Sequence, residues 1–194
     1  MAVPRLVLAS RSETRLRILR HAGFNPLVVP SDVDETLGDL ELSVAVSELA
    51  LRKASAVAAS HHEDLVLGCD SLVELDGQVL GKPFSPEEAV AWWRQLRTRS
   101  ATVWTGHALM LGGRVQLRSP RAIVHFGTVS DAEIERYVAT GEPLGAAGAF
   151  RLDGRAAAFI ESIDGDPGTV HGVSIPTLHE MLAELDVELT DLWA

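Results

Sequence analysis

Cationic and hydroxyl side chains gather at the start of the first predicted helix. The segment LVLASRSETRLRIL, residues 6–19, passes from an apolar run through Ser12 to a helical pattern with arginines at Arg11, Arg15 and Arg17. Free backbone N–H groups and the helix dipole make a helix N-terminus an anion site, and arginine adds bidentate donors for phosphate. A cation at this end otherwise costs about 0.3–1 kcal/mol. The segment therefore indicates either a phosphate site or a capped helix with solvated arginines.

Two lysines stand in unusual settings. Lys53 lies on the apolar stripe of a predicted long helix, seven residues after Val46 and four before Val57. A lysine that faces inward either extends its head to water along the stripe edge or meets an anion. Lys82 lies between Gly81 and Pro83, where it is either a phosphate ligand or an exposed turn lysine.

Asp70 directly follows a buried apolar run, predicted as a strand over residues 65–69. Ligands of α/β sheets bind at the ends of such strands, so this carboxylate is a candidate general base or metal ligand. The alternative is an aspartate that caps the turn. Cys69 beside it is predicted to be a core residue, because no histidine partner is suggested nearby in the sequence.

An acidic loop, SDVDETLGD, spans residues 31–39. Asp32, Asp34 and Glu35 offer hard oxygen ligands for a divalent cation. The alternative is a solvated acidic loop.

These side chains need a scaffold of alternating helices and strands. Hairpin turns at Asp76-Gly77 and Gly112-Gly113 add antiparallel pairs, so the pattern predicts an α/β fold with a mixed sheet. Caps are expected at Ser85, with a capping box closed by Glu88, and at Ser130. The pattern predicts helices over residues 12–22, 43–60, 85–97, 130–141 and 176–185, and strands over 6–9, 26–30, 65–69, 72–80 as a hairpin, 101–111, 114–126 and 156–163.

Composition narrows the class of protein. The chain has 194 residues, enough for one substantial domain or two small lobes that share a core. Its net charge of -10 argues against a general nucleic-acid or anionic-membrane surface. One cysteine excludes an intrachain disulfide and a cysteine-based zinc site, and no segment approaches the roughly 18 apolar residues of a membrane span. The start, MAVPRLVLAS, lacks the apolar core of a secretory signal, so we expect a cytoplasmic protein.

Six ordered motifs resemble one family over nearly the whole chain. They are LASRSETR, PSDVDE, LALRKA, GCDSLVELDGQVLGKP, TGHALML and EPLGAAGAFRLDG…FIESIDGDPGTVHGVSIPTL. In this order they resemble the Maf family of nucleoside triphosphate pyrophosphatases, once named septum-formation inhibitors. The resemblance implies a single Maf-like domain over residues 1–194. It also implies an elongated mixed β-sheet flanked by helices, similar to inosine triphosphatase, in two lobes with a central cleft, and a homodimer.

The resemblance also implies an activity. Members of the family hydrolyse a nucleoside triphosphate to the monophosphate and pyrophosphate with a divalent cation, Mg²⁺, Mn²⁺ or Co²⁺, as a house-cleaning reaction on non-standard or modified nucleotides. Carried over by motif, the phosphate ligands are Ser12, Arg15, Lys53 and Lys82, the metal ligands are Glu35 and Asp70, and the catalytic base is Asp70. Two alternatives stay open: a non-enzymatic nucleotide-binding regulator of cell division, and a related pyrophosphatase for deaminated purines.

The chain departs from the family pattern at four positions. Thr14 stands where the motif Ser-x-Arg-Arg has its first arginine, so one phosphate fork is missing, and Arg11 or Arg17 could replace it. The pyrimidine-preferring branch has Lys before Ala-Gly-Ala-Tyr and Gln before the next Gly. Ala146, Phe150 and Asp153 stand at these positions, so the sequence does not predict a preference for dTTP or UTP.

Overall fold

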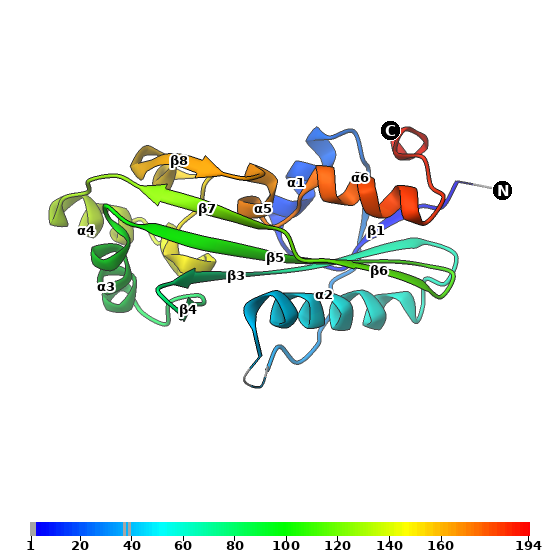
Figure 1. Cartoon of the computed structure of the whole chain (residues 1–194), viewed down its shortest axis with the longest axis horizontal. Coiled ribbons are helices and arrows are strands. Elements are labelled where there is room, and N and C mark those ends of the chain that lie inside the picture. The colour runs from blue at the N-terminus through cyan, green and yellow to red at the C-terminus, as the bar shows by residue number, and fades with distance from the viewer. Residues whose placement is uncertain (1–2, 37, 39) are drawn as a thin grey trace. The chain divides into compact units, whose positions relative to one another are not determined.

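Eight strands pair into one mixed sheet in the computed structural model, which describes residues 3–36, 38 and 40–194 (Figure 1). The sheet order is β2-β1-β3-β5-β7-β8, with β4 paired to β3 and β6 to β5. The strands are β1 (Leu6–Leu8), β2 (Leu27–Val28), β3 (Leu65–Leu75), β4 (Gln78–Leu80), β5 (Ser100–Leu111), β6 (Arg114–Arg118), β7 (Arg121–Phe126) and β8 (Ile160–Asp164). The predicted α/β class with a mixed sheet is confirmed.

Helices flank these strands. They are α1 (Glu13–His21), α2 (Leu42–Ala58), α3 (Pro86–Leu96), α4 (Asp131–Ala139), α5 (Pro167–His171) and α6 (Ile175–Glu184), with short 3-10 helices η1 (Glu142–Gly145), η2 (Ala147–Ala149), η3 (Arg155–Phe159) and η4 (Leu189–Leu192). Among the described residues, none of these helices has both the length and the apolar character to cross a bilayer.

The chain divides into two compact units. The first contains the residues up to Asp70 together with Thr105–Pro120 and Gly172–Ala194, and the second contains Ser71–Trp104 and Arg121–His171. The long strands β3 and β5 each begin in one unit and end in the other. Each unit has its own apolar core.

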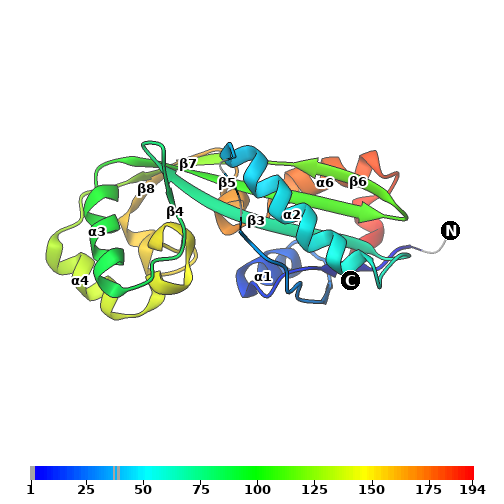
Figure 2. The same cartoon turned by 90° about the horizontal axis from the view of Figure 1, so that it is seen from below.

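In the first unit, helices cover both faces of the sheet (Figures 1 and 2). The helices α1 and α6 lie on one face and α2 lies on the other. Alternate side chains of a strand point to opposite faces, and the strands follow this rule. Leu6, Leu8, Leu65, Leu67 and Cys69 pack with α1 and α6, whereas Val7, Ala9 and Val66 pack with α2. Asp70, four residues after Val66, consequently falls on the α2 face.

Two glycines let α2 lie directly on the sheet. A Cβ added to Gly68 would lie 2.3 Å from the carbonyl oxygen of Ala50, and one added to Gly106 would lie 2.0 Å from that of Val46. Both contacts are with helix backbone, which cannot rotate away as a side chain can. The backbone of α2 therefore approaches the strands closely, and this approach sets the depth of every side chain on its inner face.

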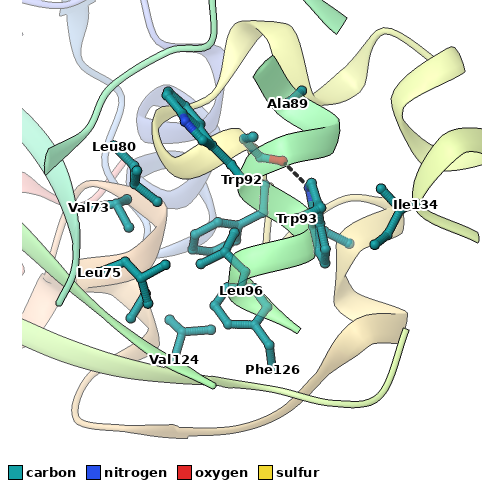
Figure 3. Packing of buried hydrophobic residues seen from close by; sticks show 14 of the residues in the cluster. Val73, Leu75, Leu80, Ala89, Trp92, Trp93, Leu96, Val124, Phe126 and Ile134 are labelled. Carbon is teal, nitrogen blue, oxygen red and sulfur yellow. Dashed lines mark hydrogen bonds between the residues drawn. The ribbon is translucent and has the colours of Figure 1, made fainter. Parts of the chain in front are cut away.

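The second unit is built around Trp93 (Figure 3). This fully buried side chain makes edge contacts with Phe126, Tyr137 and Phe159 at centroid distances of 5.1–5.6 Å. Its indole N–H donates to the carbonyl oxygen of Ala149 at 2.8 Å. The aromatic cluster thereby ties α3 to α4 and to the segment around η2.

The predicted helix caps are confirmed at Ser85 and Ser130, and Ser12 caps α1. The capping box expected at α3 forms only in half. The Ser85 hydroxyl accepts from the backbone N–H of Glu88, but the Glu88 carboxylate accepts from the N–H of Phe84, 2.6 Å away, instead of that of Ser85.

Three predicted strand boundaries were wrong. The strand predicted to end at residue 69 continues as β3 through Asp70 to Leu75 and into the hairpin with β4, so Asp70 lies inside a strand and caps no turn. The segment over residues 114–126 is two strands, because Pro120 lacks an N–H group for the ladder. Residues 156–159 belong to η3 and strand structure begins at Ile160, since an alanine-rich run has little β preference.

We expect Gly106→Ala to lower the free energy of unfolding by about 1–3 kcal/mol, because the added methyl group must push α2 away from β5. Gly145→Ala is the matched control, since a Cβ at Gly145 meets nothing within 4 Å. Urea denaturation followed by circular dichroism measures both variants. Equal stability of the two would contradict the close approach of α2.

Candidate functional site

Helix α1 begins three residues after Ser10, a serine that sequence analysis did not name as a candidate site residue. The Ser10 hydroxyl accepts from the backbone N–H of Ser12 at 3.2 Å, and the Ser12 hydroxyl accepts from that of Arg15 at 3.3 Å. The position of Ser10 in the run Ala-Ser-Arg-Ser was the signal that could have revealed it. Both hydroxyls thus engage the backbone donors at the start of the helix, where an anion is favoured.

The Arg15 side chain donates hydrogen bonds to two other segments of the first unit. Its Nε donates to the carbonyl oxygen of Gly172 at 2.8 Å, and a terminal nitrogen donates to the Ser10 hydroxyl at 3.1 Å. No sequence pattern pointed to Gly172, which is 157 residues away. These two acceptors fix the plane of the guanidinium and reduce the cost of a cation in the first helical turn.

Arg11, a candidate replacement for the missing fork, pairs with Asp32 at 2.6 Å. Both side chains are largely exposed, and exposed ion pairs contribute little to stability. The proposal that Arg11 or Arg17 compensates for Thr14 stays a prediction.

Lys53 meets anions instead of extending to water. Its Nζ lies 2.6 Å from Asp70 Oδ1 and 2.6 Å from Glu35 Oε1. Lys53 and Asp70 are each only 8% exposed, whereas the side chain of Glu35 is 62% exposed. The loss of one partner from a buried ion pair typically costs about 3–5 kcal/mol, so this pair strongly constrains the approach of α2 to β3.

The acidic loop is held by the neighbour of Lys53 on α2. Arg52 donates to the carbonyl oxygen of Thr36 at 2.9 Å and pairs with Glu48. The Asp34 carboxylate accepts from the N–H of Thr36, and hydrogen bonds with Thr36 hold the pKa of Asp34 below its ordinary value. Two residues of the predicted loop, Leu37 and Asp39, lie outside the described residues.

Over the described ranges, the acidic loop does not gather as one metal centre, because no group of three or more His, Cys, Asp or Glu side chains could hold a metal ion. Asp32 pairs with Arg11, and Asp34 binds Thr36. Glu35 alone of these three is placed against Asp70, through Lys53. Glu35 and Asp70 are the two residues that the family resemblance assigns to the metal.

Cys69 lies between the two parts of this site, the N-terminus of α1 and the Lys53–Asp70 pair. The parallel register of β1 with β3 sets Leu8 beside Leu67, so the end of β1 lies next to the segment that carries Cys69. Burial raises the pKa of the Cys69 thiol to about 11, while the positive charges of Arg15 and Lys53 lower it and the charge of Asp70 raises it. The segment that leads into α1 and the segment that carries Asp70 therefore lie side by side on paired strands.

Lys82 belongs to the second unit and is exposed there. It follows β4, between a glycine whose carbonyl oxygen accepts from Gly148 N–H at 2.9 Å and the buried Pro83. The backbone on both sides of this cation is thus anchored. The chain contains fifteen arginines but only two lysines, and both lysines, Lys53 and Lys82, were predicted as phosphate ligands.

The positions that depart from the pyrimidine-preferring branch also lie in the second unit. Phe150 is buried and packs edge-on against Phe126 at 5.1 Å. The Asp153 carboxylate pairs with Arg151 at 3.2 Å, and Ala146 lies between η1 and η2. Their influence on substrate choice stays a prediction.

A comparison with sequence models of known families decides which family the chain belongs to. The sequence model of the family described as Maf-like protein matches residues 5–185. The chain belongs to the Maf family. The match includes five of the residues predicted for the site in the first unit, Ser12, Arg15, Glu35, Lys53 and Asp70, and also Lys82 of the second.

Curated relatives of this Maf-family chain share one name. A nucleoside triphosphate pyrophosphatase of Streptomyces coelicolor is 50% identical over 98% of this chain and 95% of its own length. A nucleoside triphosphate pyrophosphatase of Synechococcus elongatus is 47% identical over 100% of this chain and 99% of its own length. One of Gloeothece citriformis is 44% identical over the full length of both chains.

Among solved structures, the chain is similar to a nucleoside-triphosphatase / dITP/XTP pyrophosphatase from Mycobacterium abscessus. The TM-score is 0.40 and the identity 18%, over 64% of this chain and 75% of that one. A similarity at this level carries no argument about the site.

We expect the Cys69 thiol to be inert in the folded protein. A pKa of about 11 in place of 9.0 lowers the thiolate fraction at pH 8 about 100-fold, and burial removes access as well. Labelling with Ellman's reagent at pH 8, with and without denaturant, measures this. Fast labelling without loss of structure would contradict the buried position of Cys69.

Proposed function

We propose that this Maf-family chain hydrolyses nucleoside 5′-triphosphates to the monophosphate and pyrophosphate, with a divalent metal ion, in the cytoplasm. The proposed role is the removal of non-standard or modified nucleotides, and the proposed assembly is a homodimer. The shared name of the curated relatives supports the activity. The observation that carries the assignment of residues is the contact of Lys53 with two carboxylates, one of them on β3 beside the strand that leads into α1.

In this proposal the N-terminus of α1 binds part of the triphosphate. The Ser12 hydroxyl donates to phosphate oxygens, and the positive end of the α1 dipole attracts them. Arg15 presents a guanidinium that Ser10 and Gly172 already orient, so little side-chain entropy is lost on binding. Lys53 and Lys82 supply the remaining positive charge.

The donor chemistry of Glu35 and Asp70 fits a hard divalent cation. Mg²⁺ is usually held by one or two carboxylates together with substrate phosphates and water. Two carboxylate oxygens that lie 2.6 Å from one nitrogen are close enough to serve one cation. When bound, the metal ion neutralises phosphate charge.

Asp70 then acts as the base. One water molecule is added across the anhydride between the α and β phosphates, and the Asp70 carboxylate accepts its proton. The oxygen of the broken anhydride leaves with pyrophosphate, whose charge the lysines and Arg15 stabilise. The position of Asp70 inside β3 holds its carboxylate on a rigid element.

A panel of standard, methylated and deaminated nucleoside triphosphates with Mg²⁺, Mn²⁺ or Co²⁺ tests the proposal, with pyrophosphate release as the readout. Metal-dependent release of pyrophosphate is the expected result. Nucleotide binding without turnover on the whole panel would instead favour the non-enzymatic regulator. The preferred base in the panel separates modified from deaminated substrates.

We expect Asp70→Asn to reduce pyrophosphate release at least about 100-fold, because the amide cannot accept the proton from water. The amide oxygen still accepts from Lys53 and Glu35 stays in place, so circular dichroism should show a folded protein. Asp64→Asn is the matched control, since the Asp64 carboxylate also contacts basic side chains, those of Arg5 and His61. Full activity of Asp70→Asn would remove Asp70 from the reaction.

We expect Lys82→Ala to raise KM for the triphosphate about 10–100-fold, since a hydrogen bond to a charged group contributes about 1.5–3 kcal/mol. Arg136→Ala, which removes an exposed cation of the same unit, should leave KM unchanged. Steady-state kinetics on the best substrate of the panel measures both. Identical KM values would exclude Lys82 from the binding site.

A further inference from the structure

We propose that Lys53 and the metal ion exchange at Glu35 and Asp70, so that metal and triphosphate bind cooperatively. In the absence of ligands the Lys53 ammonium occupies the place between the two carboxylates. Metal binding displaces it, and the displaced ammonium binds the triphosphate. This inference rests on the proposed function and describes how the same site is regulated.

The distances from Lys53 Nζ to the two carboxylates support the first step, in which the metal ion displaces the ammonium. Both carboxylates contact one nitrogen at 2.6 Å, so a cation that binds these same two oxygens competes with Nζ for them. An ammonium and a divalent cation repel each other at such separations. Lys53 and the metal ion therefore compete for Glu35 and Asp70.

The burial of Lys53 supports the second step, in which the displaced ammonium binds the triphosphate. Lys53 is only 8% exposed and lies on the inner face of α2 with Ala50 and Ala54, so a displaced ammonium cannot simply move into bulk water. A buried ammonium without a counter-charge is strongly disfavoured. The backbone N–H of Ala9 donates to the carbonyl oxygen of Leu67 at 2.8 Å, so the segment that leads into α1 runs beside the part of β3 that leads to Asp70, and a phosphate bound at the N-terminus of α1 lies near Lys53. The triphosphate supplies the new partner.

Charge gives the direction of the coupling. Two carboxylates and one ammonium leave the three side chains with one net negative charge, which repels a triphosphate. A divalent cation reverses this to one net positive charge. Metal binding thus favours the triphosphate, and by linkage the triphosphate favours the metal to the same extent, typically 5–150-fold.

The first test measures Mn²⁺ alone, without nucleotide, by the loss of the free-ion electron paramagnetic resonance signal. Lys53→Met should bind Mn²⁺ at least about 10-fold more tightly than the wild type, because the competing ammonium is gone. Arg20→Met, which removes an exposed cation of α1, should bind Mn²⁺ as the wild type does. Equal or weaker binding by Lys53→Met overturns the exchange.

The second test measures the coupling. The affinity for an α,β-methylene nucleoside triphosphate, which cannot be cleaved between these phosphates, is determined with and without Mn²⁺. Metal–nucleotide association in solution is the same for every variant and cancels in the comparison. The enhancement by Mn²⁺ should be at least about 10-fold larger in the wild type than in Lys53→Met, and equal enhancement overturns the proposal.

Lys53→Met removes one partner of a buried ion pair and can fail to fold. Two further measurements then replace those made on Lys53→Met. Lys53→Gln keeps a hydrogen-bond donor for Asp70 without the positive charge and should repeat the result of Lys53→Met. The wild type itself contains two lysines, so ¹⁵N-lysine labelling gives two side-chain signals, which Lys82→Ala assigns. The Lys53 signal should shift when Mg²⁺ and the uncleavable analogue are both present, and an unchanged signal overturns the exchange.

Pyrophosphate release by the wild type, measured separately, distinguishes the two ideas. Turnover without a difference in Mn²⁺ affinity between wild type and Lys53→Met refutes the exchange and leaves the proposed function. A difference in Mn²⁺ affinity without turnover on any substrate refutes the function and supports the competition between Lys53 and the metal.

Discussion

The ion pair between Lys53 and Asp70 joins α2 to β3 in the interior of the first unit. Two charged groups that are each 8% exposed stay in place only because each neutralises the other, and the partly exposed Glu35 completes the arrangement. If either buried partner were apolar, the other would be an unpaired charge, which is far more costly than an exposed one. The position of the helix on the sheet and the chemistry of the site thus depend on one contact.

Backbone packing sets that contact. Gly68 and Gly106 allow the backbone of α2 to touch the strands, and the alternation along β3 turns Asp70 toward the same face as Gly68. A side chain at either glycine would move the helix outward and lengthen the distance between Nζ and the carboxylate. The glycines therefore belong to the positioning of the site, although neither contributes a functional group.

The arginine-rich start of α1 follows a different principle. A cation in the first helical turn opposes the helix dipole, yet the Gly172 carbonyl oxygen and the Ser10 hydroxyl both accept from the Arg15 guanidinium and offset this cost. Arg11 precedes the N-cap of α1 and pairs with Asp32 at the surface. The two arginines thus have different environments, and only Arg15 is held in a fixed orientation by the backbone of a distant segment.

The sequence by itself determined the α/β class, the caps at Ser85 and Ser130, and the core position of Cys69, because these depend on periodicity and local hydrogen bonds. It also indicated that Lys53 faces inward. Only the tertiary structure decided which anions Lys53 meets, that Asp70 lies inside a strand, and that Ser10 and Gly172 hold Arg15. Along the chain, Lys53 is 18 residues from Glu35 and 17 from Asp70, and Arg15 is 157 residues from Gly172. Such pairings arise from strand register and helix packing, which no local pattern specifies.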